Sequence, residues 1–323
     1  MSKDHAEVIE RQMLTNSQRE EISRLKRERD VIILAHYYVE DDAQDVADFI
    51  GDSFYLAQKA QDIRCSILVF AGVEFMAQSA KLLSPEKRVL MPDTTAGCPM
   101  AHMVLKSTVD NARARYGDDL AIVCYVNSTI QTKSWSDVCV TSSNAVKIVS
   151  QLPQHHILFI PDMNLGHYIS QQLPSKRIIL NDGFCVSHEA IELQEIEALK
   201  AAHPEAYICV HPECAAWIVD AADYVGSTSG IIRRVVSGKE TDYIIGTVFG
   251  VHHEIEKQLA ASGQLNKHIY FPKTVPICRN MSKVTGEKVL ACLRDETGEV
   301  AVDPRYAVGA RAALERMLEL ARA

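Results

Sequence analysis

Three cysteines occupy similar loops at similar intervals along the 323-residue chain. Cys98 ends the stretch "PDTTAGC", Cys185 ends "NDGFC" and Cys278 ends "PKTVPIC", and the cysteines are 87 and 93 residues apart. No short zinc or ferredoxin motif has this spacing, but three thiolates together suit a soft metal, either zinc or an iron–sulfur cluster. A [4Fe–4S] cluster held by three cysteines would leave one iron open as a Lewis acid. On the spacing alone, three packed thiols remain the alternative.

A second group of residues could move protons. Three apolar runs each end in a pair of polar residues: His36 and Tyr38, Tyr125 and Asn127, His211 and Glu213. Together they supply two imidazoles, two phenols, an amide and a carboxylate, which suit general acid–base catalysis next to a carbonyl or an imine. A single histidine of this kind is more often structural, so the prediction depends on the grouping.

Hydroxyl side chains form a third group, in short stretches that each precede a helical pattern. The stretches are Asp52–Ser53, Thr141–Ser143 and Ser227–Ser229. Capping of the following helix explains any one of them. If they surround one centre, the hydroxyls and the helix N-termini would form a pocket for carboxylates or phosphate. Such a pocket is compatible with a protein of net charge −8.

The three groups recur because the chain repeats itself. Apolar runs end at His36, Tyr125 and His211, which are 89 and 86 residues apart. The same two intervals separate the aspartates of three related stretches, "ADFIGDS", "SDVCVTS" and "ADYVGST". Short apolar runs separated by helix-length segments are typical of parallel strands in an α/β fold. Equal intervals at two landmarks indicate internal repetition.

We therefore predict an α/β protein of three units, each with about four parallel strands. The units cover residues 1–99, 100–186 and 187–279. Ligand sites of parallel sheets lie at the carboxyl ends of the strands, so the cysteine loops would converge if the units surround a pseudo-threefold axis. For residues 280–323 we predict a hairpin over 288–303, with its turn near Thr297–Gly298, followed by an amphipathic helix. Both segments are expected to pack on the first unit.

Composition excludes several other classes of protein. The negative net charge argues against nucleic acid as the main partner. No run of about eighteen uncharged apolar residues exists, which argues against a membrane span. The N-terminal stretch carries charges throughout and lacks an apolar signal core, so we expect a cytoplasmic protein. Neither of the common glycine-rich phosphate-binding motifs occurs.

Many ordered stretches resemble one family, the quinolinate synthases, which form the pyridine ring in de novo NAD biosynthesis. The resemblance spans about residues 31–281 and rests on these stretches: "LAHYY", "DFIGDS", "GVEFMA", "MPDTTAGCPMA", "CYVNST", "TSSNA", "FIPDMNLG", "NDGFCVSHE", "VHPEC", "YVGSTSGI" and "ICRNM". It implies three pseudo-threefold-related α/β/α sandwich domains with parallel sheets and an active site at their common centre. It also implies a [4Fe–4S] cluster held by Cys98, Cys185 and Cys278, with the fourth iron open to substrate.

The resemblance further implies a reaction and a set of residues. The family condenses iminoaspartate with dihydroxyacetone phosphate and releases phosphate and two waters to give quinolinate. By motif position, the catalytic residues are His36, Tyr38, Tyr125, His211 and Glu213. The substrate-binding residues are His36, Ser53, Tyr125, Asn127, Ser142, His211, Glu213, Ser227 and Thr228. Met76 and Asn164 are expected to line the same centre.

The same residues also suit two other functions. The same cysteines could serve a zinc-dependent lyase or aldolase, and the hydroxyls could belong to an anion-binding module without turnover. The expected partners are the two small substrates, with a transient contact to L-aspartate oxidase, which makes iminoaspartate.

Overall fold

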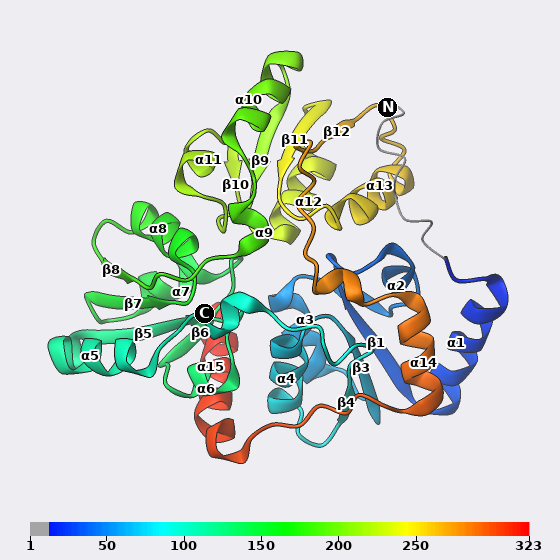
Figure 1. The fold of residues 1–323 in the computed structure, drawn as a ribbon, viewed down its shortest axis with the longest axis horizontal. Coiled ribbons are helices and arrows are strands. Elements are labelled where there is room, and N and C mark those ends of the chain that lie inside the picture. The colour runs from blue at the N-terminus through cyan, green and yellow to red at the C-terminus, as the bar shows by residue number, and fades with distance from the viewer. Residues whose placement is uncertain (1–12, 323) are drawn as a thin grey trace.

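Three separate four-stranded sheets, all parallel, make up the protein, which confirms the predicted α/β fold with three similar domains. The structure, a computed structural model, describes residues 13–322; residues 1–12, part of the charged N-terminal stretch considered above, lie outside that range. In Figure 1 the units form three lobes around a common centre. In sheet order the strands are β2 (Phe49–Gly51), β1 (Val31–His36), β3 (Ile67–Ala71) and β4 (Arg88–Leu90); β6 (Val138–Val140), β5 (Leu120–Tyr125), β7 (His156–Ile160) and β8 (Arg177–Leu180); β10 (Tyr224–Val225), β9 (Tyr207–Val210), β11 (Asp242–Gly246) and β12 (His268–Tyr270).

The repeated aspartates have a structural role at equivalent places in the three sheets. The carboxylate of Asp48 accepts a hydrogen bond of 2.8 Å from the backbone N–H of Ile33. Asp137 and Asp223 accept equivalent bonds from the central strands β5 and β9, at 2.6 and 2.8 Å. Each aspartate precedes an edge strand and satisfies a strand N–H group where the backbone ladder has not yet begun. The interval found in the sequence therefore marks the start of strand pairing.

Helices follow the strands in the same order in each unit. Their bounds are α1 Asn16–Glu28, α2 Asp41–Asp45, α3 Ser53–Asp62, α4 Glu74–Leu83, α5 Lys106–Tyr116, α6 Ile130–Ser134, α7 Ala145–Gln151, α8 Met163–Gln172, α9 Val186–Glu189, α10 Leu193–Ala202, α11 Ala216–Asp220, α12 Thr228–Ser237, α13 Val251–Ala261, α14 Gly286–Asp295 and α15 Pro304–Arg322. Among the described residues, none of these helices has the length and apolar character needed to cross a membrane.

The predicted hairpin over 288–303 is wrong, because most of its first half belongs to helix α14. Gly286, Val289, Leu290 and Leu293 are buried at helical spacing, and this period of 3.6 outweighs the alternation read from the sequence. The Thr285 side chain caps the helix by accepting a hydrogen bond from the backbone N–H of Lys288. Gly298 has a positive φ of 77°, and Glu299 after it forms an isolated antiparallel bridge with Leu90 of the first sheet.

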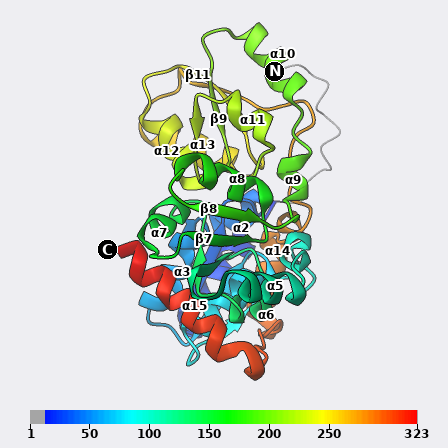
Figure 2. The same cartoon turned by 90° about the vertical axis from the view of Figure 1, so that its left-hand side faces the viewer.

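The last helix also differs from the expectation that it packs on the first unit. Helix α14 lies against α1 and α2, whereas α15 packs mainly on α6 and β6 of the second unit and touches α4 of the first (Figure 2). Gly309 explains the close approach, since a Cβ atom there would lie 2.8 Å from the backbone oxygen of Ser134. The buried side chains of α15 are all apolar: Ala310, Ala313, Leu314, Met317 and Leu318. Helix α15 therefore joins the first two units.

The hydrophobic core is shared unequally among the units. One continuous cluster includes strand residues of the first and second sheets, for example Leu34 and Val123. The third unit has two clusters of its own, and Tyr37 of the first unit enters one of them. Hydrogen bonds also join the third unit to the first, including one of 2.7 Å from Ser229 to Asp52. The common centre therefore lies between a fused pair of units and a third unit with separate cores.

Candidate active site

The carboxyl ends of the strands surround a cavity of about 650 Å³. Residues from all three units line it, as expected for ligand sites of parallel sheets. The predicted residues that line the cavity are His36, Tyr38, Ser53, Cys98, Tyr125, Asn127, Ser142, Cys185, His211, Glu213, Thr228 and Cys278. Ser227 does not line it; its hydroxyl instead caps α12 by accepting a hydrogen bond from the backbone N–H of Gly230. Met76 and Asn164 are also absent from the wall.

Two histidines occupy equivalent places in the first and third units. Nδ1 of His36 accepts a hydrogen bond of 3.2 Å from the backbone N–H of Tyr38, and Nδ1 of His211 accepts one of 3.3 Å from Glu213. Each neutral ring therefore carries its proton on Nε2. Burial lowers the pKa of both imidazoles to about 3, so both are uncharged. Nε2 of His211 lies 3.1 Å from the hydroxyl of Ser142, to which it can donate.

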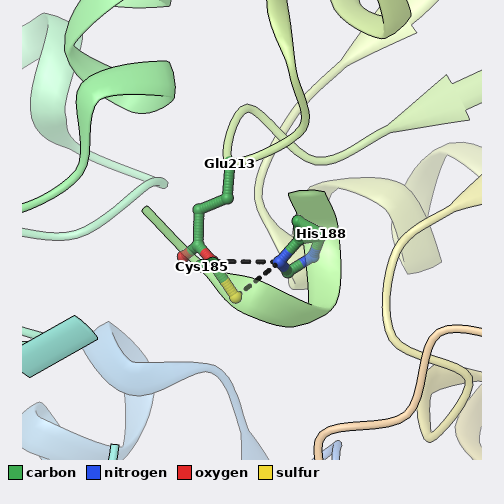
Figure 3. A group of neighbouring side chains, drawn as sticks. All are labelled: Cys185, His188 and Glu213. Carbon is green, nitrogen blue, oxygen red and sulfur yellow. Dashed lines mark hydrogen bonds and ion pairs between the residues drawn. The ribbon is translucent and has the colours of Figure 1, made fainter. Parts of the chain in front are cut away.

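Glu213 is a buried carboxylate held by groups from other parts of the chain. Its Oε1 accepts a short hydrogen bond from the Tyr125 hydroxyl, and its Oε2 lies 3.0 Å from Nδ1 of His188 (Figure 3). Burial alone would raise the pKa of Glu213, but the nearby imidazoles and these hydrogen bonds outweigh it and lower the pKa. Burial and the Glu213 charge raise the pKa of Tyr125, so the proton stays on the phenol. Asn164 supports this arrangement by donating to the backbone oxygen of Glu213 at 3.1 Å.

A chain of hydrogen bonds connects Glu213 to Tyr38. Nε2 of His188 lies 2.9 Å from the Thr247 hydroxyl, which lies 2.8 Å from the Tyr38 hydroxyl. The Tyr38 hydroxyl also lies 2.8 Å from that of Thr228. His188 and Thr247 are fully buried, so water does not interrupt the chain. Tyr38 can therefore exchange a proton with the imidazole of His188 through one hydroxyl.

His188 and Thr247 belong to the site but were not predicted from the sequence. His188 stands three residues after Cys185, and this i, i+3 spacing within a short helix was the signal that could have identified it. Thr247 directly follows β11, where the other two units have Gly72 and Pro161. The repeat therefore contained no signal for Thr247.

Each of the three cysteines precedes a short helical turn. Cys98 and Cys185 are the residues before the 3₁₀ helix Pro99–His102 and α9, and the backbone oxygen of Cys278 accepts from the N–H of Ser282 at 3.0 Å. Backbone N–H groups of each turn oppose the effect of burial on the pKa of the preceding thiol. Burial raises the pKa of Cys98 to about 12 and also raises the pKa of Cys185 and Cys278. A metal would replace the thiol protons, and the N–H groups would then stabilise the thiolates.

Side chains tie the three cysteine loops to one another. Asn181 donates from its side-chain nitrogen to the backbone oxygens of Met103 and Pro161, at 2.9 and 2.8 Å, and so joins the Cys98 and Cys185 loops. The hydroxyl of Ser187 donates to the backbone oxygen of Ile277 at 3.2 Å, which joins the Cys185 and Cys278 loops. Lys283 closes the ring by donating to the backbone oxygen of Thr95 at 2.8 Å. These contacts hold the three thiols around one cavity.

A second set of ligand atoms overlaps the first. The sulfur of Cys185, a ring nitrogen of His188 and a carboxylate oxygen of Glu213 lie within 4.8 Å of one another (Figure 3). A borderline metal such as zinc accepts these three ligand types. His188 and Glu213, however, also belong to the chain of hydrogen bonds that leads to Tyr38. The three cysteines line one cavity, and the mixed set shares Cys185 with them.

The protein has three similar α/β domains, and polar and sulfur-bearing side chains from all three line one cavity. This arrangement is typical of enzymes whose active site lies between domains. Residues 20–319 match the sequence model of the family described as "Quinolinate synthetase A protein". The chain belongs to the quinolinate synthase family. It is thus an enzyme of NAD biosynthesis with quinolinate synthase activity, from a family that carries a [4Fe–4S] cluster.

Similar curated proteins cover almost the whole chain. A quinolinate synthase of Fusobacterium nucleatum is 46% identical over 303 residues, which are 94% of this chain and 99% of that protein. One from Caldicellulosiruptor saccharolyticus is 45% identical over 300 residues, covering 93% and 97% of the two chains. "Quinolinate synthase 2" of Methanosarcina acetivorans is 42% identical over 301 residues, covering 93% and 95%.

The tie made by Asn181 can be tested by metal binding. We expect Asn181→Ala to weaken the binding of Co²⁺ to the metal-free protein about tenfold or more, because residues that orient metal ligands have effects of this size. The measurement is an anaerobic Co²⁺ titration followed by thiolate-to-cobalt absorption. Ser84→Ala is the control, since it removes a buried bond of 2.7 Å to the backbone oxygen of Ala60 outside the cavity wall. Equal Co²⁺ affinity in Asn181→Ala and wild type would contradict the role of this tie.

Proposed function

We propose that the central cavity condenses iminoaspartate with dihydroxyacetone phosphate to quinolinate, with release of phosphate and two waters. The observation that carries the proposal is that Cys98, Cys185 and Cys278, one from each cysteine loop, line the same cavity as the proton-transfer residues. The direct test is an anaerobic assay for quinolinate from dihydroxyacetone phosphate and enzymatically generated iminoaspartate. Absence of quinolinate from protein with a full complement of iron would contradict the proposal.

In this proposal the three cysteines hold the [4Fe–4S] cluster of the family. These residues fit such a group, because the three cysteines line one cavity and each precedes a short turn whose backbone N–H groups favour the thiolate. The bound cluster would supply an iron without a protein ligand, which acts as a Lewis acid toward a leaving hydroxyl. The mixed set with His188 is less suited to metal binding, since His188 and Glu213 are already engaged with Thr247 and Tyr125.

Neutral donors on the cavity wall would bind the anionic substrate groups. The hydroxyls of Ser53, Ser142 and Thr228 line the wall, and Ser53 and Thr228 are the first residues of helices α3 and α12. Helix N-termini favour phosphate and carboxylate. The buried Oδ1 of Asn127 has no hydrogen-bond partner among the described residues, and it can accept from an imine N–H or a hydroxyl of the substrate. Ser227 supports this wall only by capping α12.

The neutral imidazoles and the path from Tyr38 to His188 would carry out different proton transfers. His36 and His211 are neutral and can donate from Nε2 to a carbonyl or imine that gains negative charge. Glu213 keeps the Nδ1 proton of His188 directed toward its carboxylate, so Nε2 can accept from Thr247, and Thr247 from Tyr38. Tyr38 thereby becomes a base that removes a proton during isomerisation. The return of that proton along the same path makes Tyr38 the acid for a later step.

Iminoaspartate also has to reach the cavity intact. An imine is hydrolysed by water, so a short path from the enzyme that makes it would conserve substrate. We therefore include a transient contact with L-aspartate oxidase in the proposal. A higher yield of quinolinate per iminoaspartate formed with the two enzymes together than with the oxidase behind a dialysis membrane would support it, and equal yields would contradict it.

Glu213→Gln tests the proton path. We expect quinolinate formation to fall at least about 100-fold, because the neutral amide no longer holds the His188 proton in place. The iron content and the absorption of the cluster should remain those of the wild type, since Glu213 is not a proposed ligand. Glu240→Gln is the control, because Glu240 is a half-buried carboxylate of the third unit that pairs with Arg234 outside the cavity. Wild-type turnover in Glu213→Gln would contradict the proton path, whereas an anion-binding module would form no quinolinate in either protein.

Cys98→Ala tests the metal ligands. We expect anaerobically prepared wild-type protein to be brown and to carry about four irons per chain, and the variant to lose the cluster. Cys209→Ala removes a fully buried thiol that lies outside the cavity and should keep all of the iron. A fully loaded cluster in Cys98→Ala would contradict the ligand assignment. Colourless wild-type protein with one zinc would instead favour the zinc-dependent lyase.

A further inference from the structure

The wall of the cavity has almost no fixed positive charge. Of the described residues that line it, Arg279 is the only lysine or arginine. The imidazoles of His36 and His211 are neutral, as shown above, whereas Asp52 and Glu213 contribute carboxyl groups to the same wall. The whole chain is acidic, with a net charge of −8. An anionic ligand that approaches the cavity therefore meets one permanent cation.

Arg279 is exposed and stands next to Cys278, in the segment between β12 and the 3₁₀ helix Met281–Lys283. Its backbone is held, because its carbonyl oxygen accepts from the Ser282 hydroxyl at 3.3 Å. No carboxylate of the described part of the chain lies within ion-pair distance of its guanidinium. Several other arginines are paired in this way: Arg19, Arg24, Arg29, Arg88, Arg113, Arg234, Arg294 and Arg305. All five N–H donors of Arg279 are thus available to an anion from solvent.

The surroundings of Arg279 strengthen its effect on an approaching anion. Ile277 and Val186 line the same cavity and are exposed apolar residues, so they add no competing charge. A single unpaired cation beside a cavity with low-dielectric walls attracts anions into it and raises their association rate. Each substrate of the proposed reaction is an anion: iminoaspartate has two carboxylates, and dihydroxyacetone phosphate has one phosphate. The Arg279 charge therefore attracts both substrates.

We propose that Arg279 captures the anionic substrates at the cavity and delivers them to the neutral hydroxyls of the wall. This inference rests on the proposed function, because it takes its substrates from that reaction. Arg279 acts through its charge during binding, and the hydroxyls and helix N-termini hold the bound groups. Its removal should therefore raise the KM of the substrates and leave kcat nearly unchanged. Lysine keeps the charge and should replace arginine in this role.

The test compares three variants under anaerobic conditions at low and high salt. We expect Arg279→Gln to raise the KM for dihydroxyacetone phosphate about tenfold at low salt, with kcat within about twofold of the wild type. Added salt should raise the wild-type KM toward that of Arg279→Gln, because salt screens the attraction. Arg279→Lys should keep most of the wild-type KM and its salt dependence. Arg64→Gln, which removes an exposed arginine outside the cavity, should behave as the wild type.

A second readout separates this inference from the proposed function. Calorimetric titration of the product, quinolinate, should give about tenfold weaker binding to Arg279→Gln than to the wild type at low salt. The cluster absorption of each variant is recorded first, because a substitution beside Cys278 could release the cluster. If Arg279→Gln loses it, the salt dependence of KM is compared between Arg279→Lys and the wild type. Wild-type KM, quinolinate affinity and salt dependence in Arg279→Gln would overturn the role of Arg279. A wild-type protein that makes no quinolinate would overturn the proposed function instead.

Discussion

The buried carboxylate of Glu213 is the group on which the assembly of the site depends. A charge out of water is costly unless partners compensate for its lost hydration. The partners come from different parts of the chain: the Tyr125 hydroxyl from the end of β5, and the His188 imidazole from α9. The side chain of Asn164 in α8 donates a hydrogen bond to the backbone oxygen of Glu213. The ionised group is therefore tolerated only when the second and third units are in contact.

The same requirement explains why the interface around the cavity is polar. The first and second units share one apolar core, whereas the third unit has two clusters of its own. Contacts across the cavity include hydrogen bonds, such as those between the Tyr38 hydroxyl and the hydroxyls of Thr228 and Thr247. Hydrogen bonds contribute about 1 kcal/mol each in net terms, so this interface specifies geometry more than it adds stability. Proton transfer needs that geometry.

Much of this arrangement was predictable because the chain repeats. Similar intervals located the strands, the aspartates at the start of strand pairing and the three cysteine loops. Parallel sheets bring such loops together at the carboxyl ends of their strands. The repeat could not identify Thr247, whose counterparts Gly72 and Pro161 have no hydroxyl. The role of Ser227 stays a prediction, because a capping hydroxyl and a ligand-binding hydroxyl have the same sequence signature and the structure shows the capping bond. The hairpin was wrong because the apolar residues of α14 satisfy both periods over a few positions, and packing against α1 selected the helix.

The ring of ties between the cysteine loops has a consequence for the order in which the protein can mature. Asn181 and Met103 are both present once the second unit has been made, so the first two loops can be joined early. Cys278 of the third loop comes 93 residues after Cys185, and Lys283 follows it. Domains fold as units during synthesis, with the N-terminal ones first. A nascent chain therefore contains two of the three thiols before the third has been made, and a site that needs all three sulfurs cannot form until then.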